Sequence, residues 1–336
     1  MSVGILATGT YVPTPRMTSA ALAEATGIPE AVIREKFGVH EKPVPGPEDH
    51  TCAMGARAAL AALDKCGVDP LEIDVILSIS EEYKEHPLMV SGIKIQQLVG
   101  ARNAWAVDVA QRCCTTIAAL KLARGLMAAD DRIRTVLLAG GYRNGDLIDY
   151  RNPRVSFMYS LAAAGGALVL RRGMDRNLVM EASLISDGDF ADDVRVQAGG
   201  TVAPVTAASP PDEGALMLDV TDAPAMKARL GERSHPNFMR VIREAAERSG
   251  FDAVDYLGLL HMKRSAHRAV LAEVGLTEAD AVYLEDYGHM GQLDPIFCLE
   301  LGAASRRLRD GDRVVLASAG VSYAWGAVGV QWGRAG

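Results

Sequence analysis

Short apolar runs of the strand type alternate with helix-type segments along the whole of this 336-residue chain. The run IDVILSIS (73–80) is almost continuously apolar, which is typical of a strand buried on both faces of a sheet. The alanine-rich segment TCAMGARAALAALDKCG (51–67) follows the helix pattern, and we expect Gly67 to end that helix. This alternation predicts an α/β protein with helices packed on a largely buried sheet.

The second half of the chain repeats the build of the first half in outline. The segment VDYLGLLHMK (254–263) is similar to IDVILSIS, and DGDRVVLASAG (310–320) is similar to DDRIRTVLLAGG (130–141). Short apolar strands resemble one another by chance, so the repeat is faint. It predicts a duplicated α/β unit, with one half at residues 1–172 and the other at residues 173–336.

Composition and charge limit the partners that the chain can have. The net charge of −7 argues against nucleic acid as a partner, because phosphate binding needs a basic face. No run of about 18 apolar residues occurs, so we expect no transmembrane helix and no membrane partner. The N-terminus lacks the basic region of a signal peptide, and five irregularly spaced cysteines do not suggest a disulfide framework. A reduced, cytoplasmic setting is therefore expected.

Two adjacent cysteines open a helix-type segment, where the apolar run AWAVDVA (104–110) breaks at Gln111 and Arg112. A thiol in the first turn of a helix faces unpaired N–H groups and the positive end of the dipole, and both lower its pKa. Thiolate is the nucleophile that takes an acyl group from a thioester. Cysteine is also a common buried apolar residue, so local sequence alone leaves Cys113, and especially Cys114, open to a structural role.

Metal and dinucleotide chemistry have little support in the motifs. The chain has no CxxC pair, and adjacent thiolates without further ligands seldom form a tetrahedral metal site. No GxGxxG motif follows the first strand, so no dinucleotide cofactor is expected. We therefore expect neither a metal nor a permanently bound cofactor.

Two of the seven histidines stand where a catalytic group is expected. His261 ends the apolar run YLGLLH, and active sites of α/β sheets gather at the carboxyl ends of strands. His289 lies in the glycine-flanked segment YGHMGQ. Each of them, taken alone, is equally well explained as a histidine that is simply satisfied in the core or at the surface.

Five segments, in order along the chain, resemble the ketoacyl-acyl-carrier-protein synthase III family of the thiolase superfamily. GILATGTYVPTPRMTSAALAEATG looks like the family's first strand and proline turn, and DVAQRC is similar to its nucleophile motif. LLHMKRS and YGHMGQLDP are similar to the strand that ends in histidine and to the turn that carries Gly-Asn, and SAGVSYAWGAVGV looks like the C-terminal glycine-rich stretch. The resemblance spans essentially the whole chain and implies Cys113, His261 and His289 as catalytic residues.

The resemblance also implies a fold, an assembly and substrates. It implies a layered thiolase-like αβαβα fold with a five-stranded sheet in each half, and a homodimer in which the segment EEYKEHPLM (81–89) reaches the partner's pocket. It implies acyl-CoA or acyl-carrier-protein thioesters as substrates, and the backbone amides of Cys113 and Val321 as the oxyanion hole. It further places substrate contacts at four residues: Lys36, His86, Arg112 and Gly320.

Several residues depart from the family's pattern. His289 stands where the family has asparagine, and Val321 stands where it has a glycine. Gln111 and Arg112 replace small residues before the cysteine, and Met-Lys-Arg follows His261 in place of Gln-Ala-Asn. The polar residues near the cysteine indicate a short or polar acyl group. Because a dry pocket opposes charge, we expect His289 to serve as a neutral donor.

The motifs and the resemblance together predict an acyltransferase of lipid or polyketide biosynthesis that acts as a condensing enzyme. Cys113 takes an acyl group, and His261 and His289 then hydrogen-bond a malonyl thioester as carbon dioxide leaves, which yields a β-ketoacyl thioester. Two alternatives stay open. A same-fold acyltransferase would pass the acyl group to a hydroxyl or amine of a small metabolite, with His261 as the base. A non-catalytic partner subunit would bind acyl chains or a carrier only.

Overall fold

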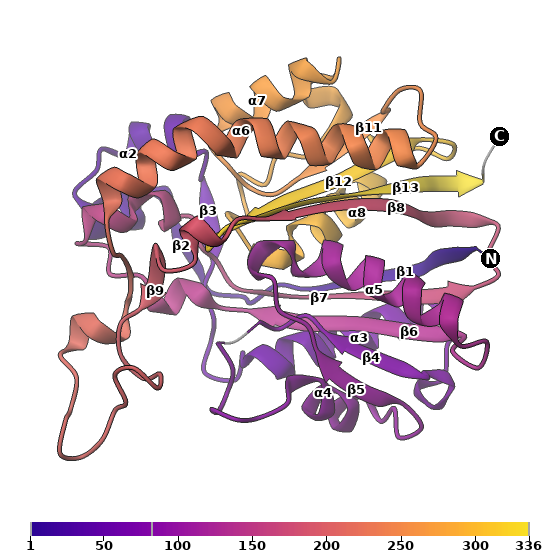
Figure 1. Cartoon of the computed structure of the whole chain (residues 1–336), viewed down its shortest axis with the longest axis horizontal. Coiled ribbons are helices and arrows are strands. Elements are labelled where there is room, and N and C mark those ends of the chain that lie inside the picture. Colours follow the sequence, from indigo (N-terminus) through magenta and orange to yellow (C-terminus); the bar gives the residue numbers. More distant parts are fainter. Residues whose placement is uncertain (1, 82, 335–336) are drawn as a thin grey trace.

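The computed structural model describes residues 2–81 and 83–334 and is built around one central sheet (Figure 1). The first half contributes the strands β1 (Val3–Tyr11), β4 (Val75–Ser78), β5 (Trp105–Asp108), β6 (Thr135–Tyr142) and β7 (Ala164–Arg172). The second half contributes β8 (Arg176–Ser186), β11 (Tyr256–Leu259), β12 (Arg313–Gly320) and β13 (Ala324–Arg334). Their order across the sheet is β11-β12-β13-β8-β1-β7-β6-β4-β5.

Helices pack in three layers around these strands. They are α3 (Thr51–Cys66), α4 (Ser91–Val99), α5 (Thr115–Ala129), α6 (Ala223–Arg248), α7 (Arg264–Glu273) and α8 (Asp294–Ala304). The helices α3 and α4 contact first-half strands, and α6 contacts β8, β12 and β13. Between the two sets of strands, α5 reaches over to β8 and β13, and α8 reaches over to β1 and β7 (Figure 1). The predicted αβαβα layering is confirmed.

The strands are apolar on both faces because helices cover both faces. All eight residues of β6 are buried, as the apolar runs predicted. Glycine lets α3 pack directly on this strand, since a Cβ at Gly141 would collide with the carbonyl oxygen of Thr51. Gly67 ends α3 with a φ of 65°, and its N–H donates to the carbonyls of Leu63 and Asp64, so the expected helix end is confirmed.

The two halves differ at one edge of the sheet. The resemblance implied five strands in each half, but the second half has four among the described residues. The segment 281–287, which follows α7, forms turns instead of a fifth strand. Its first carbonyl, that of Ala281, accepts a hydrogen bond of 2.6 Å from Arg307, and the carbonyl of Leu284 accepts from Tyr287 and Gly288. Backbone carbonyls that a strand would pair are therefore satisfied by the Arg307 side chain and by neighbouring N–H groups of the turn.

The expected boundary between residues 172 and 173 falls in the turn that joins β7 to β8. Gly173 occupies that turn with a φ of 77°. The two half-sheets are linked through the pairing of Gly4 with Leu178, and each half lends a helix to the central layer. The division into domains at 1–172 and 173–336 stays a prediction.

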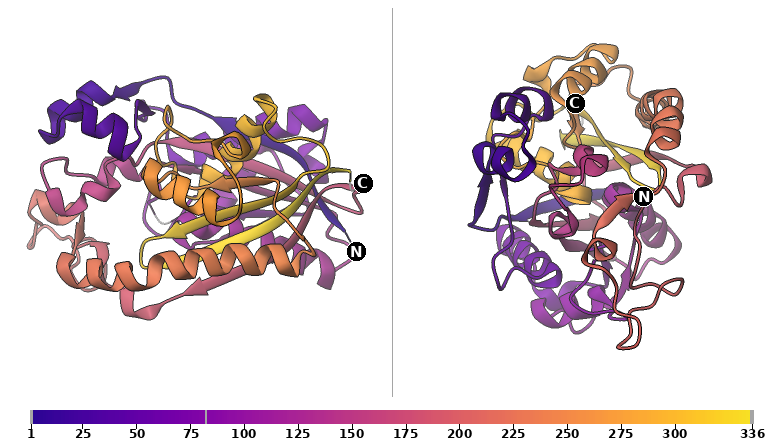
Figure 2. Two further views of the ribbon diagram at one scale, coloured as in Figure 1. Left: turned by 90° about the horizontal axis from the view of Figure 1, so that it is seen from above. Right: turned by 90° about the vertical axis from the view of Figure 1, so that its left-hand side faces the viewer.

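Two excursions extend the molecule at the end opposite the chain termini (Figure 2). The first comprises β2 (Arg16–Thr18), α1 (Ser19–Thr26), α2 (Glu30–Val32), a π-helical turn (Ile33–Phe37) and β3 (Glu41–Pro43). The second carries the strand pair β9 (Val194–Val196) and β10 (Leu218–Val220). Across the described residues, none of the helices is both long enough and apolar enough to span a bilayer.

Candidate active site

Three residues that lie far apart in the sequence meet at one cavity of about 730 Å³. Cys113 lies in a single 3-10 turn (Arg112–Cys114) that leads into α5. His261 follows the end of β11, and His289 lies in the turn before α8. The parallel strands β11 and β12 both point their carboxyl ends toward this cavity, as expected for an α/β active site.

A strained turn holds the Cys113 thiol in place. Arg112 adopts a left-handed φ of 51°, which is uncommon for a residue with a side chain. The hydroxyl of Thr115 donates to the Arg112 carbonyl at 2.6 Å and accepts from the Gln111 N–H at 2.8 Å. The Ser318 hydroxyl on β12 donates to the Cys113 carbonyl at 2.7 Å. The turn is therefore fixed to both α5 and β12.

His289 bridges the thiol and a buried carboxylate. Its Nε2 lies 3.2 Å from Sγ of Cys113, and its Nδ1 lies 2.6 Å from Oδ2 of Asp294. Its backbone N–H donates to the Ser160 carbonyl at 2.8 Å, and its carbonyl accepts from Ala162 at 2.9 Å. The ring is thus held from both sides of the turn, in the order thiol, imidazole, carboxylate.

Asp294 is a member of the site that the sequence did not single out. It is fully buried, and it opens α8 immediately before Pro295. The signal in the sequence is an Asp-Pro pair at a helix start, five residues after His289. That pattern is common at helix starts, and nothing in it reveals that the carboxylate faces a histidine.

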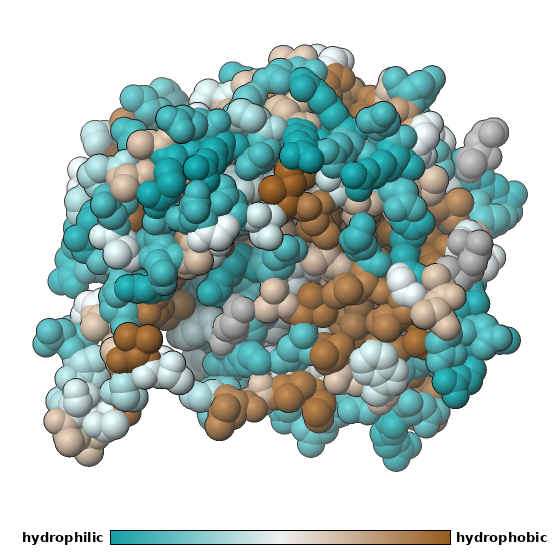
Figure 3. Space-filling view, viewed as in Figure 1, coloured by the Kyte–Doolittle hydropathy of each residue, from teal (hydrophilic) through white to brown (hydrophobic). Residues whose placement is uncertain are grey.

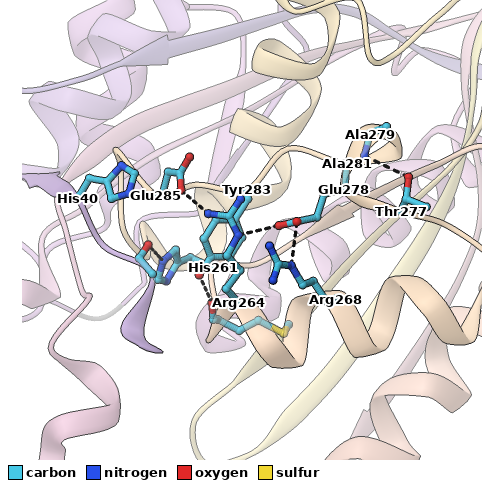
Figure 4. Close-up of polar contacts among 12 residues, drawn as sticks. His40, His261, Arg264, Arg268, Thr277, Glu278, Ala279, Ala281, Tyr283 and Glu285 are labelled. Carbon is cyan, nitrogen blue, oxygen red and sulfur yellow. Dashed lines mark hydrogen bonds and ion pairs between the residues drawn. The ribbon is translucent and has the colours of Figure 1, made fainter. Parts of the chain in front are cut away.

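His261 is bonded very differently from His289. Its backbone N–H donates to Oδ2 of Asp294 at 2.7 Å, and its ring Nε2 lies 3.1 Å from the Gly38 carbonyl, to which it donates. Within the described part of the chain, its Nδ1 has no hydrogen-bond partner. Tyr283 packs over the ring at 5.5 Å between centroids, and Arg264 beside it pairs with acidic residues that follow α7 (Figure 4).

The two histidines differ in charge because their surroundings differ. Burial lowers the pKa of His261 to about 4, so this ring is neutral at physiological pH. Burial also disfavours a charged His289, but the charges of Asp294 and Cys113 outweigh it and hold the pKa of His289 well above its usual value. The expectation of a neutral His289 is therefore wrong, because the carboxylate behind the ring stabilises the cation.

The thiols also differ from expectation. Burial raises the pKa of Cys113, and the charge and hydrogen bond of His289 act against that rise. The expected lowering of the Cys113 pKa is therefore not found, because burial outweighs the effect of His289, which is the group that favours thiolate. Burial holds the pKa of Cys114 well above its ordinary value, and its Sγ points to the carbonyls of Ser318 and Ala324.

The structure brings some of the other expected residues to the site and leaves others outside it. Arg112 and Val321 line the cavity. Gly320 lies against the nucleophile turn, since a Cβ there would come within 3.0 Å of the Cys113 nitrogen. Lys36 and His86 are exposed and do not line the cavity, because the π-helical turn and the loop after β4 direct them outward. The structure does not support substrate contacts at those two residues.

The cavity wall is more apolar than the sequence indicated. Its apolar lining includes Leu147, Phe157, Met158, Leu161, Val194, Val196, Leu218 and Tyr323. Its charged and polar lining includes Glu81, Arg112, Asn144, Arg195 and Lys263. Apart from Tyr323, which lies between β12 and β13, these apolar residues come from the loop after β6 and from the β9–β10 excursion, segments that sequence patterns did not assign to the site. No cluster able to hold a metal ion occurs among the described residues.

Comparison with known proteins identifies the family. A family model described as 3-oxoacyl-[acyl-carrier-protein] synthase III matches residues 107–188, and its C-terminal counterpart matches residues 245–332, together half of the chain. The β-ketoacyl-[acyl-carrier-protein] synthase III of Roseiflexus castenholzii is 26% identical, over 96% of both chains. The 3-oxopimeloyl-[acyl-carrier-protein] synthase of Rhodothermus marinus is also 26% identical, over 98% of this chain and 93% of its own.

Solved structures agree with this assignment at the level of the fold. The crystal structure of 3-oxoacyl-(acyl carrier protein) synthase III from Pseudomonas aeruginosa PAO1 superposes with a TM-score of 0.84 at 20% identity, and the match covers 100% of each chain. The chain belongs to the 3-oxoacyl-[acyl-carrier-protein] synthase III family, with its thiolase-like fold. It is accordingly an acyltransferase of the condensing type, which confirms the class predicted from the sequence.

Proposed function

We propose that this chain joins an acyl group held on Cys113 to a malonyl thioester, with release of carbon dioxide and formation of a β-ketoacyl thioester. One observation carries the proposal. Cys113 is the one cysteine among the residues lining the cavity, and the Nε2 atom of His289 lies 3.2 Å from its sulfur. A thiol paired with an imidazole in this way is the arrangement required for nucleophilic attack on a thioester.

In the first half-reaction, the Cys113 thiolate attacks the acyl thioester and the donor thiol leaves. The backbone amides of Cys113 and Val321 serve as the oxyanion hole. The close approach of Gly320 to the Cys113 nitrogen supports this assignment, because it brings the end of β12 beside the nucleophile turn. Loss of one such donor typically costs about 10²–10³ in rate.

In the second half-reaction, His261 and His289 hydrogen-bond the carbonyl of the malonyl thioester as it loses carbon dioxide. The Nε2–H of His261 donates to the Gly38 carbonyl in the substrate-free protein. The substrate carbonyl therefore takes the place of the Gly38 carbonyl. Since His261 is neutral and His289 is charged, the enolate develops beside one neutral and one cationic donor.

The substrates are acyl-CoA or acyl-carrier-protein thioesters, and no bound cofactor takes part. The apolar lining contributed by Phe157, Met158 and Leu218 supports an apolar acyl group in place of the short or polar group expected from the sequence. Arg195 and Lys263, which also line the cavity, support the entry of an anionic malonyl thioester. An apolar acyl group and an anionic malonyl thioester fit an enzyme of lipid or polyketide synthesis, for which we propose a cytoplasmic location.

A homodimer joined along β5 fits the exposed surface. This strand ends the sheet, and it exposes Trp105 and Val107, which are 48% and 40% accessible. Leu122 of α5 is 49% accessible, and hydrophobic side chains gather over α5 and around α4 and β5 on the face in Figure 3. A second copy that pairs along β5 would cover this unpaired edge and the apolar surface beside it. Leu88, which is fully exposed, would then be available to contact the partner.

Two consecutive measurements test the proposed reaction. Intact-mass spectrometry after incubation with a panel of acyl-CoA thioesters should show one acyl adduct, strongest for apolar chains. Adding malonyl-CoA or malonyl-carrier protein should then discharge the adduct, with one carbon dioxide released for each β-ketoacyl thioester formed. Discharge only by a hydroxyl or amine acceptor would replace condensation with acyl transfer, and absence of any adduct would indicate a non-catalytic binding subunit.

A further inference from the structure

One buried carboxylate ties the two catalytic histidines together. Oδ2 of Asp294 accepts hydrogen bonds from the His289 ring at 2.6 Å and from the backbone N–H of His261 at 2.7 Å. Oδ1 accepts from the Met290 N–H at 2.8 Å. Asp294 also opens α8, where the N-terminal end of the helix favours negative charge. The carboxylate is thus held charged, with one oxygen facing Nδ1 of His289.

This contact decides where the His289 proton resides. A carboxylate can only accept, so the nitrogen that faces it carries the proton. When His289 is neutral, Nδ1 therefore holds the proton and Nε2 holds a lone pair. A neutral His289 cannot donate from Nε2 to a substrate carbonyl, and it can do so only as the cation. An asparagine at this position, as in the family, donates without any such exchange.

We propose that Asp294 is a positioning residue that makes His289 the proton carrier between the two half-reactions, in place of the fixed neutral donor of the family. The proposal rests on the function proposed above. It assigns Asp294 a role through His289, because Asp294 contacts the ring and backbone of the catalytic residues and does not line the cavity.

The proton balance follows step by step. In the reactive form of the site, the Cys113 thiolate lies beside the His289 cation. Thiolate attack forms the new carbon–sulfur bond, the bond to the donor sulfur breaks, and His289 gives its Nε2 proton to the departing thiolate. His289 is then neutral, and it takes up one proton from solvent. Malonyl decarboxylation supplies the electron pair of the new carbon–carbon bond, the bond to Cys113 breaks, and the thiolate–imidazolium pair is restored.

Other charged and titratable groups surround this pair on every side. They come from the loop after β4, the nucleophile turn, β6, β3 and the segment after β11, and they are Glu81, Arg112, Tyr142, Lys42 and His261. The charge of Glu81 opposes the Cys113 thiolate, as does that of Asp294. The cationic His289 is therefore the group in contact with the sulfur that favours thiolate, which makes its proton the quantity to measure.

The test is the pH dependence of Cys113 alkylation by iodoacetamide in the substrate-free enzyme, read by peptide mass spectrometry. The midpoint in the parent reflects burial, which raises the pKa of the thiol, and the charge and hydrogen bond of His289, which lower it. In Asp294→Asn the midpoint should rise, and alkylation at pH 6 should slow at least about tenfold, the effect of one pKa unit. Asp294→Glu, which keeps the carboxylate, should recover part of the loss. An unchanged midpoint in a folded Asp294→Asn variant would overturn the proposal.

A double-mutant cycle separates this role from a purely structural one. If Asp294 acts through the imidazole, Asp294→Asn should not raise the midpoint in the His289→Asn background, because the direct effect of the Asp294 charge on the thiolate has the opposite sign. An equal shift of the midpoint by Asp294→Asn in both backgrounds would overturn the proposal. If Asp294→Asn does not fold, His289→Asn alone is measured, and a midpoint equal to that of the parent would overturn the proposal. Alkylation needs no malonyl thioester. The alkylation result can therefore be interpreted even if the condensation reaction is not observed.

Discussion

His261 and His289 share one carboxylate, yet His261 is neutral and His289 is cationic. Asp294 contacts the ring of His289 but only the backbone N–H of His261. The ring of His261 instead meets the Gly38 carbonyl and the face of Tyr283, and its pKa falls to about 4. The comparison shows that burial alone keeps a histidine neutral, whereas a carboxylate at Nδ1 reverses that effect. Proximity to a charge matters less than which atom of the histidine donates the hydrogen bond.

The largest expected effect concerns Cys113, the thiol that pairs with His289. Cys113→Ala should abolish the acyl adduct completely, because no other cysteine lines the cavity among the described residues. Cys114→Ala is the matched control and should keep the adduct, since that sulfur faces backbone carbonyls on β12 and β13. Peptide mapping after incubation with acyl-CoA would check both. An adduct that survives in Cys113→Ala contradicts the mechanism.

The second prediction separates the two histidines by function. His261→Ala should slow overall turnover by about 10²-fold or more, the usual scale for a positioned acid, base or donor. It should leave the pH midpoint of Cys113 alkylation in place, because His261 does not contact the sulfur. Steady-state turnover and alkylation, measured on the same preparation, would show the split. A large shift of the alkylation midpoint in His261→Ala would mean that the two histidines do not act independently.

The third prediction concerns how stability depends on pH. The contributions of the two histidines should change with pH in opposite directions. The folded pKa of His261 is near 4, below the ordinary value of about 6.5. Its contribution to stability is therefore present above pH about 6.5 and is lost as pH falls toward 4, up to about 3 kcal/mol. The folded pKa of His289 is raised, so its contribution is present below pH about 6.5 and is lost as pH rises through that pKa.

Urea unfolding across this pH range would check the signs. His261→Gln should lose less stability than the parent between pH 6.5 and 4, whereas His289→Asn should lose less than the parent above pH 6.5. The same slope in His261→Gln and in the parent at low pH would show that this ring is not the buried neutral group described. Parallel curves of unfolding free energy against pH for His289→Asn and the parent above pH 6.5 would contradict the charge difference between the histidines.

The sequence predicted the parts of this site that depend on local pattern. Apolar runs indicated where the strands lie. The motifs pointed to Cys113, His261 and His289, and all three line one cavity. The charge states were not predictable, because they depend on burial and on a carboxylate whose direction no local pattern encodes. The apolar wall was missed for a similar reason, since Leu147 comes from the loop after β6 and Leu218 from the β9–β10 excursion, and neither segment has a regular apolar period. Among the described residues, the second half also lacks the fifth strand of the central sheet that the family resemblance implied.

The smallest expected effect comes from a substitution that disturbs the nucleophile turn and leaves His261 in place. In Gly320→Ala, the new Cβ would lie 2.8 Å from the Cβ of Arg112 and 3.0 Å from the Cys113 nitrogen, so the turn must shift by a few tenths of an ångström. Because acyl transfer depends on alignment of the thiol with the oxyanion donors, acylation should slow by about tenfold, less than full loss of a donor would cost. Gly125→Ala in α5 is the matched control, since nothing lies within 4 Å of its added Cβ. Stopped-flow acylation should be normal in that control, and an equally normal rate in Gly320→Ala would show that β12 does not position the nucleophile.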